Sequence, residues 1–271
     1  MNLDGRLVLI TGASSGIGAS TARAAAKKGA RTILLARTRS KLDALVEEIS
    51  AGGGEARAYE VDCGDREAVA RVAEQITDEV GTPDVIVNNA GAGRFFFLEE
   101  TPPEEFQQLM SAPFFAAVYI TRAFLPAMVE RDSGVILNVN SPVAFVAWPG
   151  AAGYAAARWA LRGFNDALRT DLYGTGLKVC HLLPARVASP YLEHNPGAAE
   201  GIPTIARITR LLTTEEVADA IVRTIERERR LVFVPFLLRL IMLYARLFPR
   251  QTEWITVKTA KPRPQIGTPA P

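Results

Sequence analysis

The stretch LVLITGASSGIG, residues 7–18, decides the fold. Its apolar run over residues 7–10 has the composition of a buried strand, and the strand ends where Gly12 follows a threonine. From Ile17 onward, apolar side chains recur at helical spacing until Gly29 ends the pattern. The stretch therefore predicts a strand, a tight glycine turn and a helix in succession.

The same alternation continues along the whole chain. Further strands are predicted over residues 32–36, 56–61, 85–88, 135–139, 177–183 and 231–234, and further helices over 40–49, 69–76, 103–128, 153–173 and 217–225. The helix at 40–49 starts with Ser40 and Asp43 in an arrangement like a capping box. Right-handed crossovers place such helices on both faces of a parallel sheet. The sequence thus predicts an α/β fold with a Rossmann-type doubly wound parallel sheet of about seven strands.

The glycine turn indicates a dinucleotide site. Backbone amides and the positive end of the helix dipole can meet a pyrophosphate there, and glycines let the backbone approach it closely. The predicted contacts are Gly12, Ser14, Ser15, Gly16, Ile17 and Gly18. A tight turn without a ligand is the plain alternative. The sequence of this turn also fits a nucleophile elbow, the motif of a hydrolase in which Ser14 would act with His181 or His194. Such an elbow needs an oxyanion loop after an earlier strand, and no strand precedes residue 7 to supply one.

The end of the second strand indicates which cofactor binds. In such units an acid at this place favours a free ribose 2′-hydroxyl, whereas an arginine favours a 2′-phosphate. Here the sequence is Ala36-Arg37-Thr38-Arg39, with no acid. We therefore expect NADP, held by Arg37 and Arg39, in preference to NAD. Two solvated loop arginines are the alternative.

Composition narrows the classes of function. The chain has 271 residues, 48% of them hydrophobic, with a net charge of +2. We expect no nucleic-acid partner from so small a charge, and no metal site from two cysteines and two histidines. The start of the chain resembles no secretory signal, so we expect a cytoplasmic protein. The predicted units are residues 1–235 as the dinucleotide-binding and catalytic domain, 236–260 as an apolar and basic helical extension, and 261–271 as a disordered tail.

Further motifs resemble the short-chain dehydrogenase/reductase family over nearly the whole chain. The matching residues are Thr11-Gly12-x3-Gly16-x-Gly18, Asp62, Asn88-Asn89-Ala90-Gly91, Ser141 and, 13 positions later, Tyr154. The resemblance implies that Asp62 with Cys63 lies near the adenine, that Asn89, Ala90 and Gly91 line the cofactor, that Ser141 holds the substrate oxygen and that Tyr154 is the acid/base. A phenol titrates near pH 10, so it needs a neighbouring cation to exchange a proton near neutrality.

Three positions depart from the family pattern. Arg158 stands where the family has a lysine one helical turn after Tyr154; it keeps the positive charge but does not release its proton. Pro113 replaces an asparagine and is expected to kink its helix. Ala185 replaces a glycine after Pro184. The resemblance implies Tyr154, Ser141 and Arg158 as catalytic residues, and Tyr154, Arg158, Val187 and Ser189 as further contacts of the cofactor.

The expected function is an NADP(H)-dependent oxidoreductase that interconverts a carbonyl and an alcohol. The alternative is a divergent relative that binds cofactor but is redox-silent or performs non-redox chemistry. Residues 95–97 (Phe-Phe-Phe) and Trp148 lie where a substrate would meet the nicotinamide, so we expect a lipophilic small molecule, unless these aromatics pack beneath the loops. Residues 190–212, which include His194, have the length and position of a substrate-covering loop.

The segment 236–248, FLLRLIMLYARLF, is more apolar than a surface helix should be, yet it is too short and too charged to span a bilayer. With Arg239, Arg246 and Arg250, and with Arg227, Arg229 and Arg230 before it, the segment suits peripheral contact of residues 236–250 with an anionic membrane. A helix buried against its own domain or a second subunit is the alternative. We expect a homodimer or homotetramer.

Overall fold

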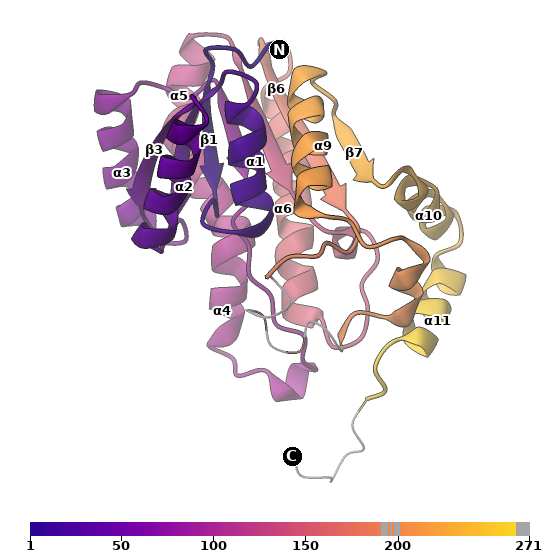
Figure 1. The fold of residues 1–271 in the computed structure, drawn as a ribbon. Coiled ribbons are helices and arrows are strands. Elements are labelled where there is room, and N and C mark those ends of the chain that lie inside the picture. The colour runs from indigo at the N-terminus through magenta and orange to yellow at the C-terminus, as the bar shows by residue number, and fades with distance from the viewer. Residues whose placement is uncertain (191–194, 196, 198–200, 264–271) are drawn as a thin grey trace.

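A computed structural model describes residues 1–190, 195, 197 and 201–263. Its centre is one sheet of seven parallel strands in the order β3-β2-β1-β4-β5-β6-β7 (Figure 1). The strands are β1 (Leu7–Thr11), β2 (Arg31–Ala36), β3 (Glu55–Glu60), β4 (Val85–Asn88), β5 (Gly134–Val139), β6 (Leu177–Pro184) and β7 (Leu231–Val234). The predicted Rossmann-type sheet is confirmed, with every strand in its expected place.

Helices cover both faces of the sheet (Figure 1). Helices α1 (Gly16–Ala26), α2 (Arg39–Ala51) and α9 (Thr214–Glu226) bury their apolar stripes against one face. Helices α3 (Arg66–Glu79), α5 (Ala116–Glu130) and α6 (Ala152–Asp171) pack on the other. The strand order reverses between β1 and β4, so the carboxyl ends of these strands open the crevice in which such folds bind ligands.

The predicted helix at 103–128 is interrupted. It divides into α4 (Glu105–Met110), one π-helical turn (Ser111–Phe115) and α5, and Pro113 lies in the π turn. A proline lacks the N–H that a regular α-helical bond needs, and the wider turn accommodates it. The stretch Glu105–Glu130 is long and apolar enough to cross a bilayer. However, Ile120, Phe124 and Met128 of α5 are buried in the sheet core, as in a core helix of a globular domain.

The start of α2 differs from the predicted capping box at Ser40. The helix begins one residue earlier, at Arg39, and its N-cap residue is Thr38. Asp43 instead accepts a hydrogen bond from the Arg39 side chain, with 2.8 Å between Nε and Oδ1. This shift of one residue moves Arg39 out of the loop and onto the helix.

The predicted helical extension at 236–260 consists of two helices that follow β7. Helix α10 (Phe236–Leu247) packs beside β7, and α11 (Pro249–Thr259) packs against α10 and against the short 3₁₀ segment η4 (Thr204–Ile208) (Figure 1). The Thr204 hydroxyl donates to the Thr259 carbonyl at 3.1 Å. Residues 264–271 of the predicted tail lie outside the described residues.

A buried histidine makes stability depend on pH. His181 lies on β6, and burial lowers its pKa to about 4, whereas an unfolded histidine titrates near 6.5. Because the unfolded chain takes up the proton first, the free energy of unfolding should fall as pH drops below about 6.5, by about 1.4 kcal/mol per pH unit down to about pH 4. Urea unfolding of the parent and of His181→Asn checks this. The variant should show a flatter slope above about pH 5, where few carboxylates titrate; equal slopes would contradict the prediction.

Candidate active site

The turn between β1 and α1 is shaped to receive an anion. Gly12 and Gly16 have left-handed φ angles of +66° and +53°, which favour glycine. A Cβ on Gly12 would lie 3.1 Å from the Ala90 Cα. Helix α1 has no acid in its first turn, and within the described residues the side chain of its N-cap, Ser15, makes no capping hydrogen bond. The first-turn amides therefore remain available to a bound phosphate.

The segment after β4 is hydrogen-bonded to this turn. Thr11 Oγ1 accepts from the backbone amides of Asn89 and Ala90, each at 2.9 Å. The Asn89 side-chain amide donates back to the Thr11 carbonyl at 3.0 Å. A Cβ on Gly91 would lie 2.6 Å from Nη2 of Arg158, so glycine lets the guanidinium approach the backbone. The ends of β1 and β4 and the side chain of Arg158 thus form one rigid wall.

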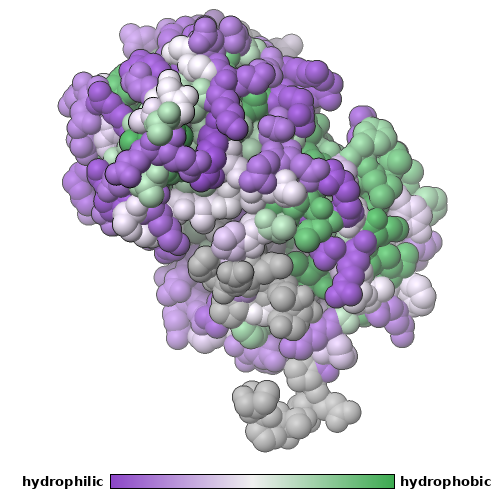
Figure 2. All heavy atoms as spheres, in the orientation of Figure 1, coloured by the Kyte–Doolittle hydropathy of each residue, from purple (hydrophilic) through white to green (hydrophobic). Residues whose placement is uncertain are grey.

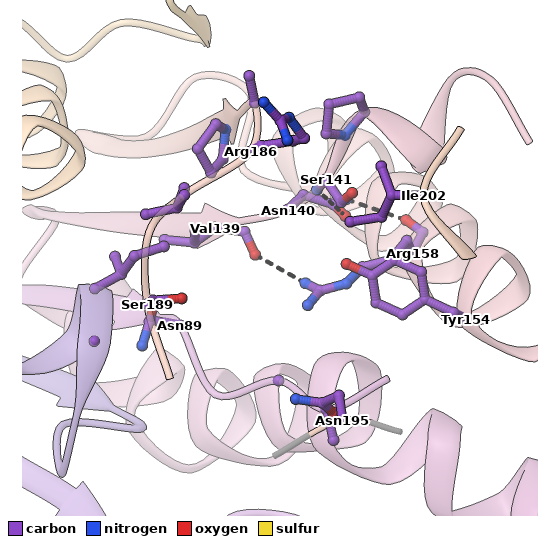
Figure 3. Close-up of a pocket in the computed structure, with 18 of the residues that line it drawn as sticks. Asn89, Val139, Asn140, Ser141, Tyr154, Arg158, Arg186, Ser189, Asn195 and Ile202 are labelled. Atoms are coloured by element: carbon purple, nitrogen blue, oxygen red, sulfur yellow. Dashed lines mark hydrogen bonds between the residues drawn. The ribbon is translucent and has the colours of Figure 1, made fainter. Parts of the chain in front are cut away.

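Tyr154 and Arg158 lie one turn apart on α6 and are both buried (Figure 3). The Arg158 Cζ is 5.1 Å from the centroid of the Tyr154 ring, and Nη1 donates to the Val139 carbonyl at 3.2 Å. Within the part of the chain that the structure describes, the buried Nε of Arg158 has no hydrogen-bond partner. The pair therefore combines a phenol with a permanent cation.

Asn140 positions this pair relative to Ser141. Its side-chain amide donates to the Arg158 carbonyl at 3.1 Å, and its Oδ1 accepts from the Ser141 amide at 2.8 Å (Figure 3). Ser141 Oγ accepts from the Val143 amide at 3.4 Å, so its hydroxyl proton can be donated to a ligand. Sequence reasoning missed Asn140; the signal was a polar side chain at the carboxyl end of a predicted buried strand.

These groups line one pocket of about 1260 Å³, above the range of about 300–1,000 Å³ typical of one small ligand. Of the predicted site residues, the pocket brings together Gly12, Ser14, Ser15, Gly16, Ile17, Arg37, Asp62, Cys63, Asn89, Ala90, Gly91, Ser141, Tyr154, Arg158, Val187 and Ser189. Burial raises the pKa of the Cys63 thiol to about 12, so this cysteine lines the wall as a neutral group.

Two predicted cofactor contacts lie outside this pocket. Gly18 faces β1, where a Cβ would collide with the Gly12 carbonyl, so it serves the close packing of helix on strand. Arg39 is paired with Asp43 and lies in a separate small surface hollow. The position of Arg39 follows from the early start of α2. Lys41, two residues further along that helix, lines the main pocket instead.

The hydrolase alternative that pairs Ser14 with His181 fails on geometry. Ser14 lies beyond the end of β1, whereas His181 lies within β6, three strands away in the sheet order. His181 is buried and does not line the pocket. His194, the other histidine considered, lies outside the described residues.

The residues present fit a nicotinamide dinucleotide. The first-turn amides of α1 suit its pyrophosphate, and the guanidinium of Arg158, which lines the pocket, can donate to a hydroxyl or carbonyl oxygen. The volume also leaves room for a second ligand.

Comparison with known proteins shows the family to which the chain belongs. A family model for short chain dehydrogenases matches residues 6–198. An uncharacterized oxidoreductase of Bacillus subtilis is 32% identical over 94% of this chain and 72% of its own length. The chain belongs to the short-chain dehydrogenase/reductase family. It spans smaller shares, between 40% and 61%, of several other curated relatives.

Solved structures agree with this family membership. A metagenomic short-chain oxidoreductase in complex with NADP is 30% identical, with a TM-score of 0.72 over 86% of this chain and 98% of the other. A short chain dehydrogenase/reductase from Burkholderia phymatum in complex with NAD has the same fold, with a TM-score of 0.83 over 97% and 99% of the two chains at 22% identity. This short-chain dehydrogenase is thus an oxidoreductase with a fold that binds NAD(P).

Aromatic side chains form part of the pocket wall of this short-chain dehydrogenase. Phe95 stacks on Trp148, with 6.3 Å between ring centroids, and tilts against Tyr154 at 5.0 Å. Phe95 and Trp148 line the pocket, whereas Phe96 packs beneath the Arg94 guanidinium and Phe97 is also outside the lining. Residues 95–97 were predicted either to meet a substrate or to pack beneath the loops. Phe95 lines the pocket, as the first prediction requires, whereas Phe96 and Phe97 do not.

The C-terminal helices of the dehydrogenase extend the pocket, which sequence reasoning missed. Leu238, Ile241 and Met242 of α10 and Ile255 and Thr256 of α11 all line it. These residues lie more than 80 positions from Tyr154 in the chain, and no periodic signal reveals such a long-range contact. The loop predicted to cover the substrate contributes residues 190, 195, 202–203, 205–209 and 211, while residues 191–194, 196 and 198–200 lie outside the described part.

Proposed function

We propose that this chain is an NADP(H)-dependent oxidoreductase that interconverts a carbonyl and an alcohol on a lipophilic small molecule. The observation that carries the proposal is the arrangement of Tyr154, Arg158 and Ser141 in the pocket that begins at the glycine turn. It supports the proposal because a proton donor, a permanent cation and a second hydroxyl could all act on one reacting oxygen.

The roles of the side chains follow from their chemistry. The glycine turn and Arg37 would hold NADPH, which when bound would supply a hydride to the carbonyl carbon. The Ser141 hydroxyl donates a hydrogen bond to the carbonyl oxygen and orients it. The Tyr154 hydroxyl donates its proton to that oxygen as the hydride arrives, and the resulting phenolate faces the guanidinium of Arg158. The reverse reaction uses the same groups in the opposite order.

The charges that line the pocket favour NADP over NAD. Among the described lining residues, Asp62 is the one carboxylate, against five cations: Arg37, Lys41, Arg158, Arg186 and Arg207. Arg37 and Lys41 lie next to Thr38 on the β2 side of the pocket, where the ribose 2′-position belongs in this fold. A 2′-phosphate adds negative charge where both cations can meet it.

Replacing Arg37 by aspartate should erase most of the preference for NADPH over NADH. A charge-assisted contact contributes about 1.5–3 kcal/mol, so the ratio of the two dissociation constants should fall by roughly 10- to 150-fold. Fluorescence titration of both cofactors measures this without knowledge of the substrate. Arg39→Asp is the matched control, since Arg39 lies outside the pocket, and it should leave the ratio within about threefold. Equal affinity of the parent for both cofactors would contradict the proposal.

The apolar part of the pocket supports a lipophilic substrate. Its apolar lining includes Phe95, Trp148, Ile202, Leu238, Ile241, Met242 and Ile255. Such a wall gains free energy from burying the apolar surface of a ligand.

The experiment that tests the function is NADPH oxidation with a panel of lipophilic ketones and aldehydes, together with NADP reduction with the matching alcohols. We expect turnover with several members of the panel. Cofactor binding without turnover across the whole panel would favour a redox-silent relative, which is the second function that Arg158 and Pro113 leave open.

A further inference from the structure

Helix α10 carries an apolar stripe that faces solvent. Phe236, Leu240, Leu243 and Leu247 follow one another at helical spacing, and between 50% and 67% of each is exposed. The opposite side of the helix holds Leu238 and Met242, which are buried against the domain. The helix thus has two apolar faces, of which one is already used for packing. The second needs an explanation, because exposed apolar stripes of this length are rare on isolated domains.

Helix α11 continues the exposed apolar surface. Trp254 is 62% exposed and Val257 is 53% exposed, while Thr256 faces inward. Figure 2 shows hydrophobic side chains gathered along the right-hand edge of the molecule, where Figure 1 places α10 and α11. We call the residues Phe236, Leu240, Leu243, Leu247, Trp254 and Val257 the apolar face.

The charges around the apolar face are almost all positive. Residues 236–263 contain six cationic side chains, at 239, 246, 250, 258, 261 and 263, and one carboxylate, Glu253. Arg239 and Arg246 flank the stripe on α10, and neither forms an ion pair within the described residues; Arg263 alone of the six pairs, with Glu99. Arg227, Arg229 and Arg230 lie at the other end of β7 from α10, so we do not count them in this surface.

The pocket opens beside this face. Leu240 and Tyr244 of α10 line the pocket and are also about half exposed. Ile205 and Ile208 of η4 are likewise both lining and exposed, at 38% and 60%. Residues that belong to the lining and to the outer surface at once form the rim of an opening. The apolar pocket is therefore continuous with the apolar face.

We propose that α10 and α11 dock on an anionic lipid surface, with the apolar face inserted among the lipids and the basic side chains against their headgroups. An apolar stripe bordered by arginines is the pattern of an interfacial helix. In this orientation the rim formed by η4 and α10 faces the lipid, so a hydrophobic molecule dissolved there reaches the pocket without crossing water. That last consequence rests on the proposed function, whereas the docking itself does not.

A second copy of the chain fits the face less well. A two-fold interface brings the same patch of each subunit together. Arg239 and Arg246 of one copy would then meet a patch that carries six cations and one carboxylate. Like charges brought together at low dielectric oppose association, whereas anionic headgroups neutralise them.

The test is co-sedimentation of the full chain with vesicles of phosphatidylcholine and of an equimolar mixture of phosphatidylcholine and phosphatidylglycerol. We expect binding to the anionic vesicles that weakens with added salt. The double variant Leu243→Asp/Leu247→Asp should bind at least about tenfold more weakly, because neither leucine lines the pocket and each buries apolar surface on docking. Arg239→Gln/Arg246→Gln should lose roughly 25-fold on anionic vesicles and little on neutral ones.

Tyr173→Asp is the control, since this side chain is exposed and lies next to the amino end of β6, whereas α10 follows the carboxyl end of the parallel strand β7. It should bind vesicles like the parent. NADPH affinity and sedimentation velocity of each variant show whether it is folded and whether its mass has changed. The proposal is overturned by failure of the parent to bind anionic vesicles, by undiminished binding of the leucine variant, or by a fall in its oligomeric mass, which would make the face a subunit interface. If vesicle binding holds and no panel compound is turned over, the proposed function fails and the docking surface stands.

Discussion

Replacing Tyr154 by phenylalanine should abolish turnover while NADPH affinity stays within about twofold of the parent. The phenyl ring keeps the packing on Phe95 and the position beside Arg158, so the pocket retains its shape. The hydroxyl that donates the proton is lost, and general acid catalysis of this kind contributes roughly 10²- to 10⁴-fold to the rate. Binding and chemistry should therefore separate in one variant, measured by fluorescence titration and by NADPH oxidation.

Tyr119→Phe is the control for this substitution. Tyr119 stacks on Phe115, with 5.7 Å between ring centroids, and does not line the pocket. Its loss of a hydroxyl should leave turnover unchanged. Undiminished turnover of Tyr154→Phe would contradict the assignment of Tyr154 as the proton donor.

Replacing Arg158 by alanine should reduce both cofactor affinity and turnover. The guanidinium donates to the Val139 carbonyl and lies against Gly91 and the Tyr154 ring, so it shapes the cofactor wall and stabilises the phenolate. Loss of a charged hydrogen-bonding partner costs about 1.5–3 kcal/mol, or roughly 10- to 150-fold in affinity, and turnover should fall by at least as much. Arg158→Lys keeps the charge and should remain within about tenfold of the parent in both measurements.

The control on the same helix is Arg162→Ala. Arg162 stacks on the Phe145 ring at 3.8 Å and donates to the Ala144 carbonyl, but it does not line the pocket. It should leave cofactor affinity unchanged. A parent that is inactive on every compound, together with activity in Arg158→Lys, would show that the arginine has ended redox turnover in this chain.

Most of the fold could be predicted from the sequence because its signals are local. Most strands are short apolar runs between turn residues, β3 (Glu55–Glu60) being the exception, and the helices that cover the sheet carry a stripe at helical spacing. The glycine turn and Tyr154 can also be predicted, because each belongs to a short motif, and the structure brings them into one pocket. The break at Pro113 was predicted as a kink, and the structure gives its form, a π turn.

The remaining parts of the site depend either on contacts between distant segments or on the residue at which a helix begins. The start of α2 at Arg39 rather than Ser40 exchanges Arg39 for Lys41 in the pocket. Likewise, the face of α10 that lines the pocket could not be separated from the exposed face, since both are apolar. Periodicity reveals an amphipathic helix only when one of its faces is polar.

The most direct test of the central claim is transfer of a label. The parent protein is incubated with a reactive ketone from the panel and with NADPH that carries deuterium at the transferable position of nicotinamide C4, and the alcohol is analysed by mass spectrometry. We predict deuterium on the carbinol carbon with the parent and with Tyr119→Phe, and none with Tyr154→Phe. Bound NADPH that keeps its label with every compound, or a labelled alcohol from Tyr154→Phe at the parent's rate, would contradict the proposed chemistry.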